Sequence, residues 1–165
     1  MIEVSEVFPN ELKIVQEIAR KTWPIAYKEI LSNEQLEYML NLFYSLDALN
    51  ANIRQGHQFL LARNSAESTG FAGFQLGYQN SFNTHLHKIY VLPEMQGKHI
   101  GEQLLENIEK RAVNARQKSI TLNVNRNNVA ISFYEKLGFS IVKTVDVEIG
   151  NGYLMEDYVM QKIIG

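Results

Sequence analysis

The sequence contains no cysteine, and this absence excludes several kinds of chemistry. Without a thiol the chain can form no disulfide, no cysteine-ligated metal site and no acyl-enzyme on a cysteine thiolate. Long apolar runs are absent as well, so no segment approaches the length that a membrane-spanning helix needs. The first residues alternate and are acidic, whereas a signal peptide begins basic and then turns apolar. We therefore expect a soluble cytoplasmic protein.

Neither sign of charge dominates the chain. Sixteen Lys and Arg residues are set against eighteen Asp and Glu residues, which gives a formal net charge of −2 at pH 7. The basic residues are scattered, so the sequence offers no basic face for nucleic acid or for an anionic membrane. With 165 residues, 45% of them hydrophobic, residues 1–165 fit a single domain with one sizeable core. A small or local partner is expected.

The patterning of apolar residues predicts a mixed α/β fold. Alternation predicts strands over residues 2–7, 57–63, 69–79, 84–91, 119–124, 140–149 and 153–164. Helical spacing predicts helices from residue 12 to a stop or bend at Trp23-Pro24, over residues 25–53, over 100–112 and over 127–136. The predicted order of elements is therefore β-α-α-β-β-β-α-β-α-β-β.

Single residues predict local features within these elements. Ser32 can cap a helix, with Gln35 three residues on, and Ser45 suggests that the helical region restarts there. In the strand over residues 69–79 three glycines interrupt the pattern, which indicates a bulge or an edge position.

The junction after the strand over residues 84–91 suits an anion. This strand stops at Pro93, and a loop with glycine opens directly into a strongly periodic helix. The first turn of such a helix carries unpaired backbone N–H groups and the positive end of the helix dipole. Gly97 and Gly101 would let phosphates approach closely, and Lys98 adds a positive charge, so we predict a pyrophosphate site here. Glycines are also common in the turns that precede helices, so the same loop has a purely structural interpretation.

Histidines and aromatic residues supply further candidates. His85 and His87 share one face of the predicted strand, but no third metal ligand is evident, so we predict no metal and favour an ordinary or substrate-facing role. The segment from residue 23 to 44 is rich in aromatic residues, most of which belong in a core. A minority would line a substrate pocket, and for this we select Trp23 and Tyr27.

Two segments resemble the signatures of a known family. Residues 127–139, which read NNVAISFYEKLGF, resemble the second signature segment of the GNAT superfamily of N-acetyltransferases. Residues 96–101, which read QGKHIG, resemble its first, Arg/Gln-x-x-Gly-x-Gly/Ala, although His99 stands where the family usually has glycine. The resemblance covers residues 69–139, fits the final hairpin by order of elements, and matches nothing in residues 23–53. It implies a mixed, mostly antiparallel sheet flanked by helices.

The resemblance also implies a cosubstrate, acetyl-CoA, and no metal. The family holds the coenzyme pyrophosphate on backbone amides of the loop, here Gln96, Gly97, Lys98, His99, Ile100 and Gly101. It pairs the pantetheine arm along the preceding strand, here Ile89, Tyr90 and Val91, where a backbone N–H also supports the thioester oxygen. Asn127 would bond the pantetheine amide, and Lys136 would reach a coenzyme phosphate.

The implied reaction is direct attack of a primary amine on acetyl-CoA in a ternary complex. Tyr134 would protonate the departing thiolate, and we take His87 as the catalytic base. His85, Glu29 and Asp157 remain open as alternative bases. A serine-bound intermediate is not excluded by the absence of cysteine alone.

The acceptor is the least determined part. Acidic residues in the variable helical segment, among them Glu34 and Glu37, could attract a cationic amine, so we favour a small molecule such as a polyamine, with a protein N-terminus, an antibiotic or an amino acid still open. A homodimer is compatible with the resemblance. The main alternative is a non-catalytic sensor or regulatory module that binds acyl-CoA. A P-loop enzyme and a dinucleotide-binding domain are disfavoured, because the Walker spacing and the GxGxxG pattern are missing.

Overall fold

A seven-stranded sheet forms the centre of the computed structural model, which covers residues 1–165. The strands lie in the order β1-β2-β3-β4-β5-β7-β6, and every neighbouring pair is antiparallel except β4 and β5, which are parallel. The strand bounds are β1 Ile2–Glu6, β2 Gln58–Asn64, β3 Glu67–Gln75, β4 Asn83–Val91, β5 Ser119–Asn125, β6 Ser140–Gly150 and β7 Tyr153–Ile163. The mixed, mostly antiparallel sheet flanked by helices is therefore confirmed.

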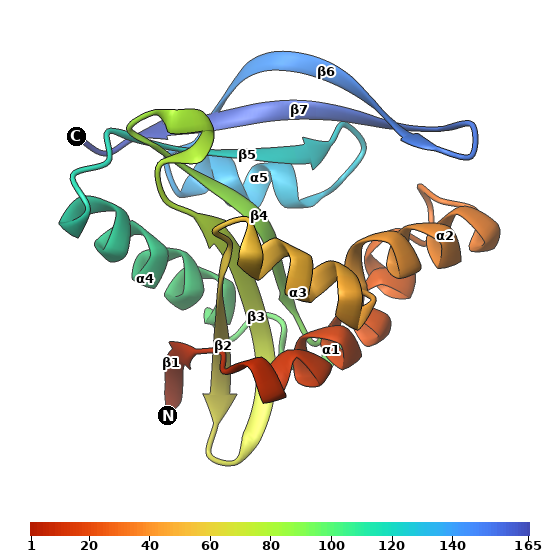
Figure 1. Cartoon of the computed structure of the whole chain (residues 1–165), viewed down its shortest axis with the longest axis horizontal. Coiled ribbons are helices and arrows are strands. Elements are labelled where there is room, and N and C mark those ends of the chain that lie inside the picture. Colours follow the sequence, from red (N-terminus) through yellow and green to blue (C-terminus); the bar gives the residue numbers. More distant parts are fainter.

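Helices cover both faces of this sheet (Figure 1). One face carries α1 Leu12–Ala26, α2 Asn33–Tyr44 and α3 Leu46–Arg54, and the other carries α4 Ile100–Asn114 and α5 Ala130–Lys136. Each helix group buries an apolar stripe against the sheet, which produces two core clusters, one on each face. None of the helices is both long and apolar enough to cross a membrane.

The region before β2 contains three helices, one more than the predicted order. Ser45 adopts an extended conformation that ends α2, and its side chain accepts a hydrogen bond from the backbone N–H of Ala48 to begin α3. The cap at Ser32 is confirmed, since its side chain accepts from the N–H of Gln35. Helix α1 continues past the predicted stop, with Pro24 inside its last turn.

The glycine-rich strand β3 lies inside the sheet, between β2 and β4, so the expected edge position is wrong. The predicted bulge is confirmed beside Gly70: Ala62 pairs with Gly70 whereas Arg63 pairs with Ser68, which leaves Thr69 of β3 between them. A second bulge lies on β4, where Gly73 pairs with Lys88 and Phe74 pairs with Leu86, which leaves His87 between them. The glycine at 73 allows a close approach, because an added Cβ would lie 2.9 Å from the Phe59 ring. Sheet packing, not an edge, explains this glycine.

The bulge on β4 turns two consecutive side chains, those of His87 and Lys88, to the same face of the sheet. Leu86 and Ile89 pack in the cluster beneath α4 and α5, whereas Lys88 contacts Asn52 of α3 and His87 stacks on His57. Without the extra residue Lys88 would share the face of Leu86, two positions earlier. His87 and Lys88 therefore both face the side that carries α1 to α3.

Candidate functional site

A cleft opens where β4 and β5 separate. The two strands pair only between Asn83–Leu86 and Ser119–Leu122, although β4 continues to Val91 and β5 to Asn125. A cavity of about 1220 Å³ lies at this gap and is lined by residues from both faces of the sheet. The β5-facing edge of β4 beyond Leu86 has no partner strand, and an extended arm of another molecule can pair with such an edge. Ile89, Tyr90 and Val91 all line the cavity.

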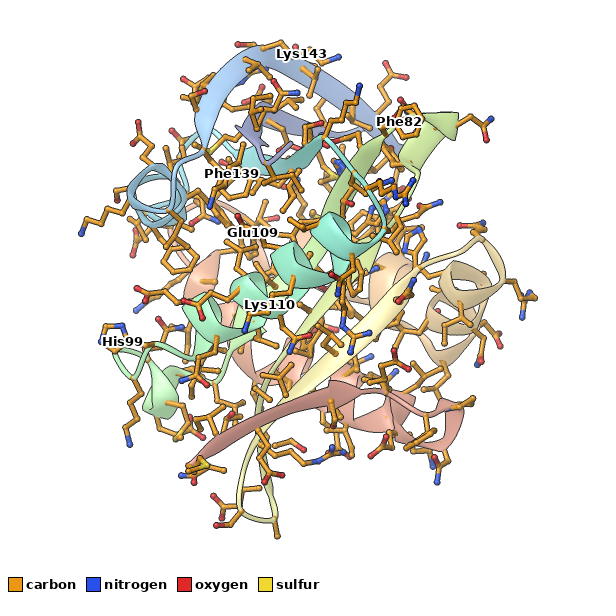
Figure 2. The ribbon with its side chains drawn as sticks, turned by 90° about the vertical axis from the view of Figure 1, so that its left-hand side faces the viewer. Phe82, His99, Glu109, Lys110, Phe139 and Lys143 are labelled. Atoms are coloured by element: carbon orange, nitrogen blue, oxygen red, sulfur yellow. The ribbon has the colours of Figure 1, made fainter.

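The loop before α4 presents a row of free backbone donors to one end of this cleft. The N–H groups of residues 97–102 have no acceptor within the protein. Gly97 has a φ of 79°, and nothing lies within 4 Å of a Cβ added there, so the backbone is open to close approach. His99 caps α4 with a left-handed φ of 61° and points out from the molecule (Figure 2). This arrangement fits a pyrophosphate.

Gly101 has a packing role that the sequence did not predict, and its predicted role toward phosphate stays a prediction. A Cβ added at this position would lie 3.2 Å from the Phe133 ring of α5. The absence of a side chain therefore lets α4 and α5 pack closely, and the close approach of phosphate is better explained by Gly97. Of the loop residues, Lys98 is exposed and does not line the cavity, whereas Gln96, Gly97, His99, Ile100 and Gly101 do.

Helix α5 places Tyr134 in the wall of the cleft. Only 8% of Tyr134 is exposed, and its ring lies 5.2 Å from that of Phe133 and 5.9 Å from that of Phe139. Burial, with a smaller contribution from Tyr27, raises the pKa of Tyr134 well above its usual value. The phenol is therefore protonated at neutral pH and can act as a proton donor.

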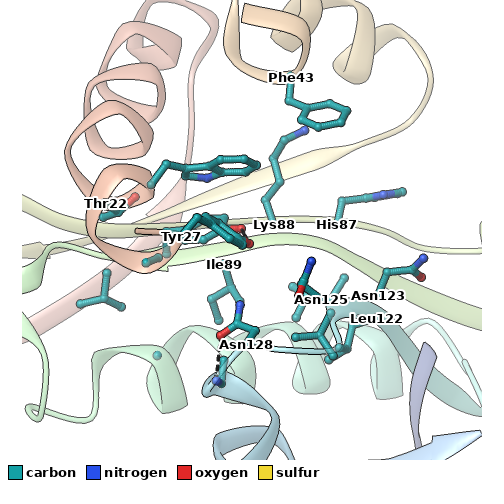
Figure 3. Close-up of a pocket in the computed structure, with 18 of the residues that line it drawn as sticks. Thr22, Tyr27, Phe43, His87, Lys88, Ile89, Leu122, Asn123, Asn125 and Asn128 are labelled. Atoms are coloured by element: carbon teal, nitrogen blue, oxygen red, sulfur yellow. Dashed lines mark hydrogen bonds between the residues drawn. The ribbon is translucent and has the colours of Figure 1, made fainter. Parts of the chain in front are cut away.

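Two other residues from the second signature segment lie outside the cleft. Asn127 and Lys136 are both exposed and do not line the cavity. Asn128 does line it, and its Oδ1 accepts a hydrogen bond from the N–H of Ala130 at 2.8 Å (Figure 3). The roles predicted for Asn127 and Lys136 stay predictions, and Asn128 is a cleft residue that the sequence interpretation did not select.

Aromatic side chains line the opposite face of the cleft, beneath α1 and α2. Trp23 and Tyr27, the two predicted substrate contacts, both lie in this wall with ring centroids 4.6 Å apart. The hydroxyl groups of Tyr27 and Tyr90 are 2.7 Å apart, and burial raises the pKa of both. Phe43 and Tyr44 of α2 complete the wall. An alkyl chain of an acceptor would find an apolar surface here.

Asp157 of β7 supplies a buried carboxylate at the same face. It is 2% exposed and lines the cavity, in which the only other carboxylate belongs to Glu102 at the start of α4. Burial raises the pKa of Asp157, and a hydrogen bond from Asn123 and the charge of Arg126 partly offset this. Glu29, another residue considered as a base, is exposed and lies outside the cavity lining.

The histidines form a stacked cluster beside the cleft. The ring of His87 lies 3.9 Å from that of His57, and its Nε2 is 3.2 Å from Oε1 of Gln75. Burial is the main cause that lowers the pKa of His85 to about 4 and that of His87 to about 2. Both rings are therefore neutral at physiological pH, and His87 is a weak proton acceptor. No group of three or more His, Asp or Glu side chains is arranged to hold a metal.

Lys88 is a cleft residue that the sequence interpretation did not select. Its Nζ donates to Oδ1 of Asn52 at 2.9 Å and lies 5.4 Å from the centroid of the Tyr44 ring. Burial lowers its pKa to about 8. Figure 3 shows Lys88 and Ile89 pointing to opposite sides of β4. Lys88 faces this side only because of the bulge on β4. The alternation of apolar residues in the sequence does not show which strand of the β3–β4 pair carries the extra residue.

Comparison with known proteins identifies the family. A model for the acetyltransferase (GNAT) domain matches residues 27–162. A spermidine N(1)-acetyltransferase of Thermoplasma acidophilum is 30% identical over 158 residues, which are 94% of this chain and 96% of that protein. The PaiA N-acetyltransferase of the same organism, in complex with coenzyme A, is 28% identical with a TM-score of 0.84 over 99% of both chains.

A more distant structure shares the fold. The ribosomal-protein-S18-alanine N-acetyltransferase of Escherichia coli is 19% identical with a TM-score of 0.76, covering 100% of this chain and 95% of that one. Together with the strand order and the cleft, these matches confirm the predicted family, enzyme class and cosubstrate. The chain therefore belongs to the GNAT superfamily, whose members are acetyl-CoA-dependent N-acetyltransferases.

Proposed function

We propose that this chain transfers the acetyl group of acetyl-CoA directly to the primary amine of a small molecule, with both substrates bound in the cleft between β4 and β5. The observation that carries this proposal is the separation of the two strands, because the resulting gap is lined from both faces of the sheet. Free backbone donors lie at the α4 end, and an aromatic wall lies beneath α1 and α2. Acetyl-CoA bound on the α4 side can thus meet an amine bound on the side of α1 and α2.

The α4 side would hold the coenzyme. Backbone N–H groups of residues 97–102 suit the pyrophosphate, and the free edge of β4 at Ile89, Tyr90 and Val91 suits the pantetheine arm. Asn127 and Lys136 are exposed near this side and would contact the coenzyme from outside the cleft. A backbone N–H of β4 would also support the developing charge on the thioester oxygen.

The chemistry then needs a proton acceptor for the amine, because an alkylammonium with a pKa near ~10 is protonated at neutral pH. We assign this role to Asp157 in preference to His87, since Asp157 is a buried carboxylate with a raised pKa and His87 is a weak base. The nitrogen forms a bond to the acetyl carbon as the carbon–sulfur bond breaks. The ammonium loses two protons in all: Asp157 takes one and releases it to solvent, and Tyr134, which gives its own proton to the sulfur, is reprotonated by the other.

The relatives indicate a class of acceptor and not a single compound. Because one relative is a spermidine acetyltransferase, a polyamine is the first acceptor to test. The alternative function, a sensor that binds acyl-CoA without transfer, would leave no need for a buried phenol and a buried carboxylate facing the same cleft. The presence of Tyr134 and Asp157 in one cavity therefore favours an enzyme.

A thiol-release assay tests this proposal. The protein is incubated with acetyl-CoA and a panel of amines that includes spermidine, amino acids and an N-terminal peptide, and free coenzyme A is followed with a thiol reagent. The proposal expects amine-dependent release with at least one small-molecule amine. Tight binding of acetyl-CoA without release for any amine would instead support the sensor.

A further inference from the structure

Lys88 carries a positive charge that has no anionic partner. It takes part in none of the salt bridges of the protein, and its Nζ contacts only the neutral amide oxygen of Asn52. Its side chain is partly buried among the rings of Tyr44 and Phe59. The ring faces attract the ammonium in part, and an opposite charge that approaches it would offset the remaining cost of its burial.

The groups around Lys88 are further hydrogen-bond donors, and none of them is negatively charged. Because Oδ1 of Asn52 accepts from Lys88, the NH₂ group of the same amide is free to donate. Nδ1 of His57, the ring that stacks on His87, is buried without a hydrogen-bond partner. Among all residues that line the cavity, Lys88 is the only Lys or Arg.

The opposite wall of the same cavity carries the opposite charge. Asp157 projects from β7, which lies beyond β5, whereas Lys88 projects from β4 on the other side of the gap. The aromatic wall of Trp23, Tyr27 and Tyr44 lies on the same face of the sheet. The cavity therefore has a negative group on its β7 wall and a positive group on its β4 wall, with the aromatic wall on the same face of the sheet.

The geometry points to an acceptor that carries a carboxylate as well as its primary amine, with the carboxylate bound by Lys88 and Asn52. This inference rests on the proposed function and narrows its acceptor class. The amine lies toward Asp157 and Tyr134, and the aliphatic part of the acceptor covers the aromatic wall. A diamine of the same length would bring its second ammonium to Lys88, where the two like charges repel each other. Lys88 is thus a specificity-determining residue that selects amino acids over polyamines.

The test compares acceptors that match in length and differ in one terminal group. The pairs are γ-aminobutyrate with putrescine and δ-aminovalerate with cadaverine, and thiol release gives kcat/KM for each. The wild-type protein should prefer the amino acid of each pair by at least about tenfold, and Lys88→Met, which keeps the apolar stem, should abolish that preference. Lys88→Glu should reverse it. Lys143→Met, at an exposed position on β6, is the matched control and should keep the wild-type preference.

Several outcomes would overturn the inference. Preference for the diamine by the wild-type protein, or an unchanged preference in Lys88→Met, would show that Lys88 does not bind a carboxylate. An equal loss with all acceptors in Lys88→Met would assign the residue a structural or catalytic role instead. In each of these three cases the proposed acetyl transfer would stand. If no amine, spermidine included, releases thiol from the wild-type protein, the proposed function itself fails and the inference falls with it.

Discussion

The hydroxyl groups of Tyr27 and Tyr90 lie 2.7 Å apart and join the end of α1 to β4 in the wall of the cleft. Burial is the main cause that raises the pKa of both phenols, so both are neutral and each can donate or accept. This contact connects the aromatic wall to the strand edge that faces the gap.

The pair should be energetically coupled. Tyr27→Phe and Tyr90→Phe each remove one hydroxyl and leave the other buried, whereas the double variant removes both. We expect a coupling free energy of unfolding of about 0.5–1.5 kcal/mol in a double-mutant cycle measured by denaturant unfolding. Additive single effects would show that the two hydroxyls do not interact.

Tyr134→Phe tests the proton donor. The substitution keeps the ring that packs beside Phe139 and deletes only the hydroxyl. General-acid assistance is worth about 100-fold to 10,000-fold, so turnover should fall within or somewhat below that range while coenzyme affinity stays nearly unchanged. Turnover is measured by thiol release and affinity by calorimetry. Full turnover in the variant would remove Tyr134 from the mechanism, and early melting with lost coenzyme binding would favour a packing role.

Asp157→Asn tests the proton acceptor. The carboxylate works only when ionised, and because burial raises its pKa, kcat/KM of the wild-type protein should rise with pH through a value above the usual range of an aspartate. The variant should lose at least about 100-fold in kcat/KM together with that limb of the pH profile. Asp47→Asn, an exposed residue in the first turn of α3, is the control. A variant with wild-type kcat/KM and an unchanged profile would return the role to another group, with His87 as the first alternative.

His99→Gly restores the residue that is usual in the first GNAT signature segment. His99 has a left-handed φ of 61°, which costs a side-chain-bearing residue roughly 1–2 kcal/mol and costs glycine little. Its contact with Glu102, at 3.2 Å, is exposed and contributes little. We expect the variant to bind acetyl-CoA as well as the wild-type protein or better, as measured by calorimetry. A large loss of affinity would mean that the imidazole itself contacts the coenzyme.

The histidine cluster should make the stability of the protein depend on pH. The pKa values of His85 and His87 are lowered to about 4 and about 2, whereas a histidine in the unfolded chain titrates near ~6.5. As the pH falls below that value the unfolded chain binds more protons than the folded one. The stabilisation is therefore complete above about pH 6.5 and is lost progressively as the pH falls, down to about pH 4 for His85 and about pH 2 for His87, by at most ~1.4 kcal/mol per pH unit for each histidine.

Melting temperatures of the wild-type protein and two variants check this dependence. His87→Gln should flatten the decline of Tm between about pH 7 and pH 5, because it removes one group whose pKa differs between the folded and the unfolded chain. His99→Gln changes an exposed histidine and serves as the control. Identical slopes for wild type and His87→Gln would contradict the assignment of a neutral, buried ring.

The parts of this fold that were predictable from sequence are those that local chemistry determines. Ser32 and Ser45 were recognised as helix starts because a cap depends on a side chain and a backbone N–H three residues away. His85 and His87 were placed on one face by strand alternation, and their rings lie 4.7 Å apart. The loop over residues 96–101 was predicted to bind phosphate because glycine, lysine and a helix start are adjacent in the chain, and the N–H groups of residues 97–101 are free in the structure.

The remaining features depend on contacts between distant segments. Lys88 meets Asn52 only because a bulge in β4 turns its side chain toward α3, and Asn52 is 36 positions away in the sequence. Gly101 has a packing role that only the position of Phe133 reveals. The separation of β4 from β5 follows from where their pairing stops, which no local pattern in either strand specifies. On the acceptor side the sequence thus pointed to Trp23 and Tyr27, which line the cavity, but not to Lys88.

Direct transfer in the cleft is tested most directly by an initial-rate experiment in which acetyl-CoA and the acceptor are varied together. Free thiol and N-acetylated product are both quantified, the second by mass spectrometry. Direct attack in a ternary complex predicts one acetylated amine for each thiol released and reciprocal plots that intersect. Parallel plots would indicate an acetyl-enzyme, and coenzyme binding without acetylated product would indicate a sensor; either result would contradict direct transfer.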